Sequence, residues 1–345
     1  MKYFTGSYLT TIIGLILAYL WGEKLCCGSG FNCIFIAIIL SILEVSLSFD
    51  NAVINAARLE KMSKIWQQRF LTWGIAIAVF GMRFLFPILV VAIFAHLGLF
   101  EVAKMAVTDV DKYAHYLHVA HPPIITFGGT FLMMLFLNFF INSKKEVHWI
   151  KFIERKLSNF ADFRGIQTAI TLLALYVTQY FNPQEVREEI LIAGLWGIAI
   201  YLLIDGLTHM LEKRSEGNSC AGVSLKNSCF AGFLYLELID ASFSLDGVLG
   251  AFALSKDILI ITIGLSIGAM FVRSLTIMLV EKKTLTQYLY LESGAHWAIG
   301  ALSAIMLIST VKEVPEIITG LLGLAFIVFA FVGSLIHNKK NKAKQ

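Results

Sequence analysis

Two short segments of the chain carry the same pattern of acidic and hydroxyl side chains. The first reads EVSLSFDNAV at residues 44–53, and the second reads DASFSLDGVL at residues 240–249. Aligned without gaps, they match acid with acid and serine with serine. The matched pairs are Glu44 with Asp240, Ser46 with Ser242, Ser48 with Ser244, Asp50 with Asp246 and Asn51 with Gly247. Oxygen ligands of these kinds, without sulfur or imidazole, favour Mg²⁺, Ca²⁺ or Mn²⁺ over Cu⁺ or Zn²⁺.

A second pair of matched segments follows the motifs in the same order. MRFLFPILV starts at Met82 and VRSLTIMLV at Val272, so Arg83 aligns with Arg273. Each arginine can neutralise an acid when no cation is bound, so we expect Arg83 and Arg273 to form ion pairs that hold helices together. For Asp50 and Asp246 such a structural role is the alternative to cation binding.

Charged side chains inside apolar segments are costly, which makes them informative. At the centre of a membrane helix each costs about 2.5–3.5 kcal/mol on insertion scales. We therefore expect the metal ligands to be Glu44, Asp50, Asn51, Asp240 and Asp246. The expected supporting residues are Ser46, Ser48, Glu237, Ser242, Ser244, Arg83 and Arg273.

A straight helix would not bring all these acids together. Glu44, Ser48 and Asn51 share one stripe, whereas Asp50 lies about 120° away at 100° per residue. We therefore expect local unwinding near residues 49–51 and 245–247, which would also free backbone carbonyls for a cation.

The composition of the chain indicates a membrane protein. Of 345 residues, 57% are hydrophobic and only 15% charged, against about 25% charged in soluble domains. The fold class predicted is all-α, a polytopic membrane protein with about ten transmembrane helices. The expected spans are residues 6–22, 31–57, 69–98, 123–142, 165–181, 189–211, 228–254, 258–280, 293–311 and 315–337.

The distribution of Lys and Arg predicts the topology. With ten spans, 20 of the 28 basic residues fall on one side, six on the other and two within spans. Both termini are then cytoplasmic. The two motifs, in the second and seventh spans, cross the membrane in opposite directions, which is the inverted-repeat arrangement of secondary transporters.

Three regions follow from this topology. Residues 1–181 form a first half with motif 44–53, residues 182–337 an inverted second half with motif 237–249, and residues 338–345 a basic cytoplasmic tail. The connector 143–164 is expected to be an amphipathic helix on the cytoplasmic interface.

The remaining polar groups give weaker signals. The five cysteines form no CxxC pair, so neither a disulfide framework nor a zinc site is indicated. His115, His118 and His121 recur in the external connector 99–122, which we expect to be a solvated loop, with a cation-collecting surface as the alternative. Asp205 and His209, four residues apart, fit a helix-end hydrogen bond or a proton relay.

The motifs SFDNAV and D-x-S-F-S-L-D-G resemble the paired acidic motifs of TerC-type membrane proteins, within the LysE-like transporter group. These proteins are linked to tellurium resistance and manganese export. The segments ELIDASFSLDGVLGAFALS and LESGAHWAIGAL are similar to a less characterised bacterial branch described only as a domain of unknown function. The resemblance covers residues 31–335 and implies Mn²⁺ efflux, with Asp50, Asn51, Asp240 and Asp246 at the ion site. Gly247 in place of a second asparagine, and the extra Glu237, depart from the pattern and leave the preferred ion open.

The expected function is export of a divalent cation, Mn²⁺ first, by a protein of the bacterial inner membrane. Its expected partners are the lipid bilayer, the metal ion as substrate and protons as a candidate counter-ion, without nucleic acid or a resident cofactor. Alternatives are a Ca²⁺ or proton-coupled exchanger, a LysE-type solute exporter, an intramembrane aspartyl hydrolase using Asp50 and Asp246, and a stress-complex scaffold. We do not expect an enzyme, because the chain has no HExxH and because an aspartyl dyad would leave Asn51 and the matched serines unexplained. Ion selectivity, transport direction, coupling and oligomeric state do not follow from the sequence.

Overall fold

A computed structural model of the chain is helical, with no strand in the part that it describes. The described residues are 2–24, 30–60, 62–94, 97–142, 145, 147–163, 165–217, 230, 232–234, 236–237, 240, 251, 254–255, 257–312 and 314–342. The second motif therefore lies mostly outside them.

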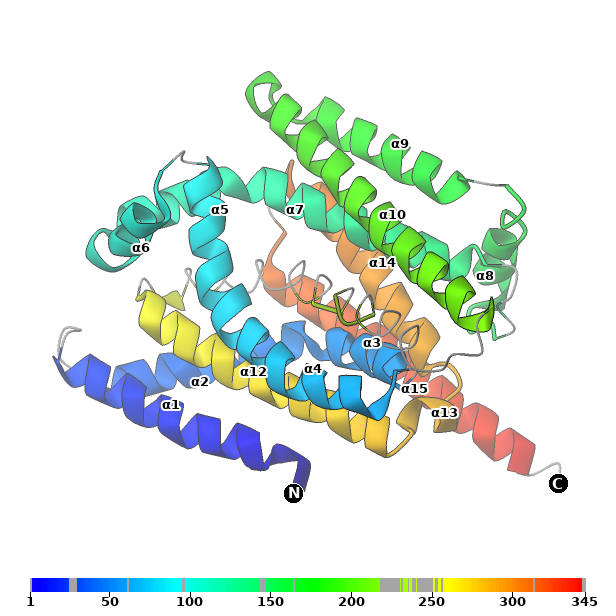
Figure 1. Ribbon diagram of the computed structural model, residues 1–345, viewed down its shortest axis with the longest axis horizontal. Helices are drawn as coiled ribbons and strands as arrows, with labels where there is room; N and C mark the ends of the chain where they lie inside the picture. Colours follow the sequence, from blue (N-terminus) through cyan, green and yellow to red (C-terminus); the bar gives the residue numbers. More distant parts are fainter. Residues whose placement is uncertain are drawn as a thin grey trace.

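Figure 1 shows the helices as a layered bundle. In chain order they are η1 (Lys2–Phe4), α1 (Thr5–Lys24), α2 (Gly30–Leu47), α3 (Phe49–Leu59), α4 (Lys64–Ala76), η2 (Ile77–Leu85), α5 (Phe86–Phe94), α6 (Leu99–Thr108), α7 (Val110–Phe140), α8 (Lys151–Ser158), α9 (Ile166–Phe181), η3 (Gln184–Val186), α10 (Arg187–Gly217), α12 (Ile258–Glu281), α13 (Thr284–Gln287), α14 (Leu291–Ser309) and α15 (Glu316–Lys342).

Within the described part, seven helical segments are long and apolar enough to cross a membrane. They are Thr5–Glu23, Gly30–Leu47, Asp111–Phe140, Gln184–Leu207, Ile258–Glu281, Leu291–Ser309 and Ile318–Lys340. Three other expected spans fall outside this set for different reasons. The span 69–98 is divided among α4, η2 and α5, α9 is a shorter apolar helix of 16 residues, and 228–254 is described at few positions.

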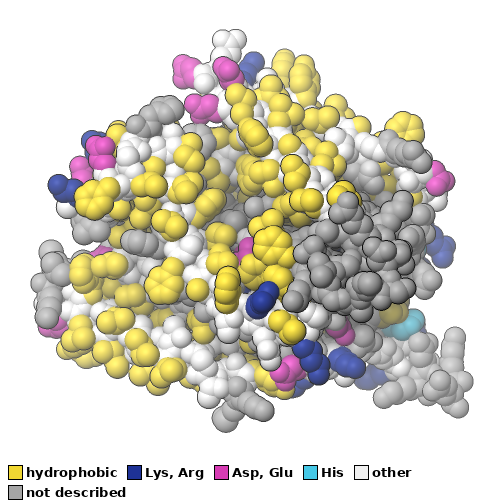
Figure 2. Space-filling model, viewed as in Figure 1, with side chains coloured by type: hydrophobic (Ala, Val, Ile, Leu, Met, Phe, Trp, Pro, Cys, Tyr) yellow, Lys and Arg dark blue, Asp and Glu magenta, His cyan; other side chains and the backbone are white. Residues whose placement is uncertain are grey.

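The surface of the bundle is as apolar as a lipid environment requires. Yellow hydrophobic side chains spread across the visible face in Figure 2, and most charged ones lie at its margins. Exposed apolar residues include Ile12, Leu173 and Phe329. Threonine hydroxyls in the helices donate to the carbonyl four residues earlier, which satisfies them without water. They include Thr11, Thr126, Thr178, Thr262 and Thr276.

The helix of the first motif is interrupted, but not where we expected. Residues 49–51 are helical, and the break lies at Ser48, with φ −102° and ψ 13°. Backbone hydrogen bonds continue across it, from Ser48 N to Glu44 O and from Ala52 N to Ser48 O. The expectation of unwinding at residues 49–51 is therefore wrong, because a bend at one residue keeps the helical bonding. Residues 245–247 lie outside the described residues.

The arginine segment of the first half is a π-helix. In η2 the Phe86 N–H donates to the Gly81 carbonyl, five residues earlier. Pro87 follows directly, and a proline ring displaces the carbonyl four residues before it, here that of Arg83. The matched position in α12 is Ile277, and α12 is a regular α-helix.

Two expectations about connectors need correction. Residues 99–122 are not a loop, because α6 and the first turns of α7 occupy them. Among the described residues of 143–164, the expected amphipathic helix is the eight-residue α8, followed by turns. At the C-terminal end, α15 continues into the basic tail as far as Lys342.

Candidate ion-binding site

In the first half, Glu44 of α2 forms a buried ion pair with Arg83 of η2. Glu44 is 2% exposed and Arg83 7%. The Ser48 hydroxyl, at the break between α2 and α3, also donates to Glu44 Oε1 at 2.9 Å. The carboxylate thus has a charged and a neutral donor, which a buried acid requires.

In the second half, Arg273 of α12 holds two acids. Its Nη2 lies 3.1 Å from Asp240 Oδ2 and 3.4 Å from Glu237 Oε1. Its Nη1 donates to the Phe70 carbonyl at 3.0 Å, and its guanidinium carbon lies 4.1 Å from the centre of the Phe70 ring. A backbone oxygen and an aromatic face therefore hold the guanidinium as firmly as the acids do.

The two ion pairs occupy matched positions in the repeat. Glu44 aligns with Asp240 and Arg83 with Arg273, and each acid contacts the arginine of its own half. The contacts among the described side chains nevertheless differ. Glu44 contacts Arg83, whereas Glu237 and Asp240 both contact Arg273.

Asn55 of α3 connects the two halves at this site. Its Nδ2 donates to Asp240 Oδ1 at 3.2 Å, although 185 residues separate them. Asn55 is 2% exposed, like Asn51 one turn earlier. The polar stripe predicted through Glu44, Ser48 and Asn51 is therefore buried, and Asn55 extends it by a turn.

Glycines allow the backbones to approach at both ion pairs. A Cβ added to Gly268 of α12 would lie 2.5 Å from Glu44 Cβ and 2.7 Å from Ser41 O. A Cβ at Gly74 of α4 would collide with the Arg273 guanidinium and with Glu237 Oε1, at 2.6 Å from the latter. No larger residue fits at either position without moving a charged group.

The other predicted site residues are placed as follows. Ser46 is exposed on α2, on the side away from Glu44. Asp50 lies in α3, but the structure does not describe its side chain. Ser242, Ser244 and Asp246 lie outside the described residues. Within the described residues, no three His, Cys, Asp or Glu side chains come together as a metal site.

Sequence reasoning missed Asn55, Gly74 and the Phe70 carbonyl. Extending the arginine alignment towards the N-terminus matches Gly74 with Gly264, a signal that was available. Asn55 follows Asn51 by four residues, the spacing of one helix face. A backbone carbonyl such as that of Phe70 leaves no trace in residue types.

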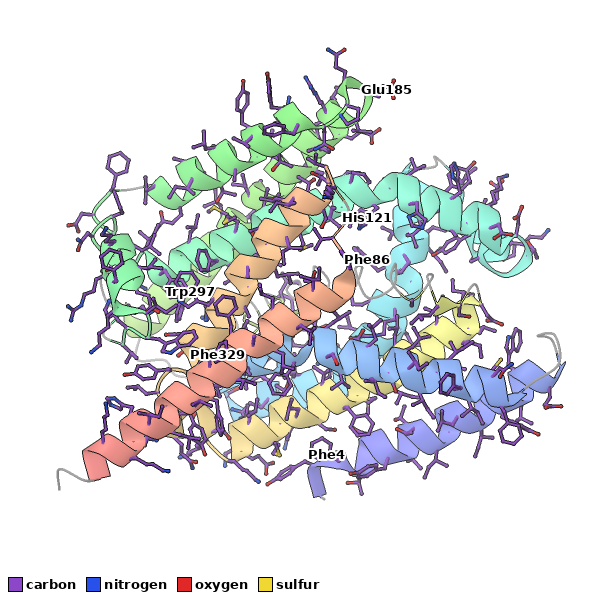
Figure 3. The ribbon with its side chains drawn as sticks, turned by 180° about the vertical axis from the view of Figure 1, so that it is seen from behind. Phe4, Phe86, His121, Glu185, Trp297 and Phe329 are labelled. Carbon is purple, nitrogen blue, oxygen red and sulfur yellow. The ribbon has the colours of Figure 1, made fainter. Side chains whose placement is uncertain are left out.

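The three histidines expected in the connector 99–122 all lie on α7. His115 and His118 are exposed on α7 and His121 is half-buried, at the place marked in Figure 3. Asp205 of α10 accepts from Asn138 of α7 at 3.4 Å. The His209 side chain is not described.

A separate polar cluster surrounds Glu154, a fully buried residue of α8. Its carboxylate accepts from Lys145 Nζ at 2.9 Å, Trp149 N at 3.1 Å, Ile150 N at 3.0 Å and Trp297 Nε1 at 3.1 Å. Burial would raise the pKa of Glu154, but the Ile150 N–H, Lys145 and the Trp297 indole hold it below its usual range. Because Trp297 belongs to α14, Glu154 fixes α8 to a membrane helix.

Long apolar helices, an apolar surface and buried acid–arginine pairs define an all-helical membrane protein that crosses the bilayer several times. The chain belongs to the family described as "Protein of unknown function (DUF475)", whose model matches residues 49–341. No curated protein and no solved structure matches the chain.

Proposed function

We propose that this protein is a transporter that exports a divalent metal cation, with Mn²⁺ as the expected cargo, through a site between two inverted halves. The observation that carries the proposal is the repeated ion pair: Glu44 with Arg83, and Asp240 with Arg273. A buried ion pair adds little stability compared with apolar packing. Two such pairs at matched positions are better explained as parts of a pathway that carries ions across the membrane.

The course of the helices supports inverted halves. In Figure 1 the α4–α5 segment and α12, which carry the matched arginines, run in opposite directions across the molecule. The same view has α8, α13 and the C-terminus towards one end and α6 towards the other. This arrangement fits ten spans with both termini in the cytoplasm of a bacterial cell.

The ion pairs suggest how an empty transporter remains neutral. Each arginine neutralises an acid while no cation is bound, and an arriving cation competes for the carboxylates. Asp50, Asn51 and Asp246 complete the proposed ligand set. Oxygen ligands of this kind suit Mn²⁺, and the likeness of the motifs to TerC-type proteins agrees with that choice.

Ion flux in proteoliposomes tests the proposal. Asp50→Asn and Asp246→Asn remove a charge at nearly constant volume, so each variant should insert and accumulate normally yet lose Mn²⁺ flux. Ca²⁺ flux and amino-acid export, measured in the same liposomes, examine the other transport functions. Unchanged Mn²⁺ flux in both variants would contradict the proposed site, and no flux with the unaltered protein would contradict the function.

A further inference from the structure

Two acidic side chains meet at one nitrogen of Arg273, and Asn55 contacts one of these acids. Asp240 Oδ2 and Glu237 Oε1 lie 3.1 Å and 3.4 Å from Nη2, and Asn55 donates to the other Asp240 oxygen at 3.2 Å. The Nη2 group thus marks a point where oxygens from two acids hold positive charge. A metal cation at the position of Nη2 would have the same two carboxylate oxygens as ligands.

The charge at this point favours a divalent ion over a guanidinium. Among the described side chains, two carboxylates share the positive charge of Arg273, and Glu237 is 5% exposed. An uncompensated charge inside a membrane protein is costly. A divalent cation in place of the guanidinium nitrogen would balance both acids.

Two ligand atoms at this point also lack partners. Asn55 Oδ1 and Glu237 Oε2 are buried without a hydrogen-bond donor from any described residue. An unsatisfied buried acceptor costs about 1–3 kcal/mol, so each calls for an explanation. Both belong to side chains that already point at the Arg273–Asp240 pair.

We propose that Asn55, Glu237 and Asp240 are ligands of a divalent cation that replaces Arg273 Nη2, with the Asn55 side-chain carbonyl turned towards the metal. This inference rests on the proposed transport function and adds Asn55 to its ligands. In the structure the Phe70 carbonyl and ring hold the guanidinium beside the acids, so it must give up these contacts when the cation binds and can regain them when the cation leaves. Because Asn55 comes from the first half and the acids from the second, the ligand set is complete only while α3 touches the second half.

Mn²⁺ binding to the purified full-length protein, followed by electron paramagnetic resonance of the free ion, tests this ligand set. Asn55→Leu removes the carbonyl at similar volume and should weaken Mn²⁺ binding by at least about tenfold, as for lost support at other metal sites. Asn55→Asp should strengthen it, and added Mn²⁺ should then raise the melting temperature. The matched control is Asn138→Leu, which removes an amide bound to Asp205 on another helix pair and should leave binding unchanged.

A second variant separates a ligand role from a structural one. Arg273→Gln removes the competing cation, so Mn²⁺ should bind more tightly and should restore any stability lost from the two unpaired acids. If Asn55→Leu binds Mn²⁺ as the unaltered protein does while that protein transports Mn²⁺, the ligand set is wrong and the transport function stands. If the unaltered protein neither binds nor transports a divalent cation, both fail.

Discussion

At the scale of single residues, the chain keeps charges in an apolar interior by giving each one several partners. Glu44 has Arg83 and Ser48, and Arg273 has two acids, a carbonyl and an aromatic ring. Removing one member of such a group leaves the others buried and unpaired, which costs more than the group itself contributes.

The Glu44–Arg83 pair makes this testable. Arg83→Gln strands a carboxylate that is 2% exposed, and we expect a loss of about 3–5 kcal/mol, the usual cost of breaking a buried pair. Adding Glu44→Gln to Arg83→Gln should restore most of the lost stability. Melting temperatures of the single and double variants in detergent provide the measurement, and a double variant no more stable than Arg83→Gln would contradict the pairing.

Residue types and spacing predicted part of this site, and physical reasons explain the rest. The repeated acids and arginines identified the charged groups, because a membrane segment seldom tolerates them without a role. The stripe through Glu44, Ser48 and Asn51 followed from helical periodicity alone. Asn55 donates a hydrogen bond to Asp240, which lies 185 residues later in the chain, and no sequence periodicity predicts such a contact.

At the scale of helices, close packing sets the position of the acids. Gly268 allows α12 to lie directly against α2 beside Glu44. The expected helices were largely found, because long apolar runs have few other structures in lipid. Their interruptions were harder to foresee: the bend at Ser48 was expected a residue or more later, and the π-helix of η2 was not expected at all.

Replacing Gly268 by alanine tests this packing. The new Cβ would press on Glu44 Cβ and on the Ser41 carbonyl, which belongs to the backbone and cannot turn away. We expect a loss of about 1–3 kcal/mol, typical of overpacking. Gly206→Ala is the matched control, since a Cβ there meets nothing within 4 Å and alanine favours the helix. Equal melting temperatures for the two variants would argue against close α2–α12 contact.

The attachment of α8 predicts a dependence on pH. The pKa of Glu154 is lower in the folded protein than its usual value of 4.5. The carboxylate therefore contributes stability above that value, and the contribution disappears as the pH falls through the folded pKa. Glu154→Gln should be less stable than the unaltered protein at pH 7, and the difference should shrink on acidification. Melting curves from pH 7 to well below pH 4.5, past the folded pKa, measure this difference. A difference that stays constant over that range would mean that charge is not what holds α8.

At the scale of the whole molecule, the proposed orientation rests on the basic residues of the connectors. With ten spans, most basic residues fall on the side proposed to be cytoplasmic. Figure 3 shows Glu185, at the tip between α9 and α10, far from Trp297, whose indole contacts Glu154 of α8. The proposal places these two sites on opposite sides of the membrane.

Reporter fusions test this orientation. Tags at residues 1, 220 and 345 should report cytoplasm, whereas tags near Asp111 and Glu185 should report the outside. The tags near Asp111 and Glu185 are the control, because the proposed topology places both of them on the side opposite to the termini. An external tag at residue 220 would leave the two motifs crossing the membrane in the same direction and would remove the basis for inverted halves.

The π-helix around Arg83 makes the two arginines mechanically unequal. An α-helix advances about 100° per residue, so a ladder that changed from five-residue to four-residue hydrogen bonds would turn Arg83 about the axis of its helix. Arg273 lies on a regular α-helix and has no such change of ladder available. If the arginines leave their acids during the proposed transport, Arg83 could do so by a turn of its backbone and Arg273 by rotation of its side chain, so the two halves need not release their acids at the same rate.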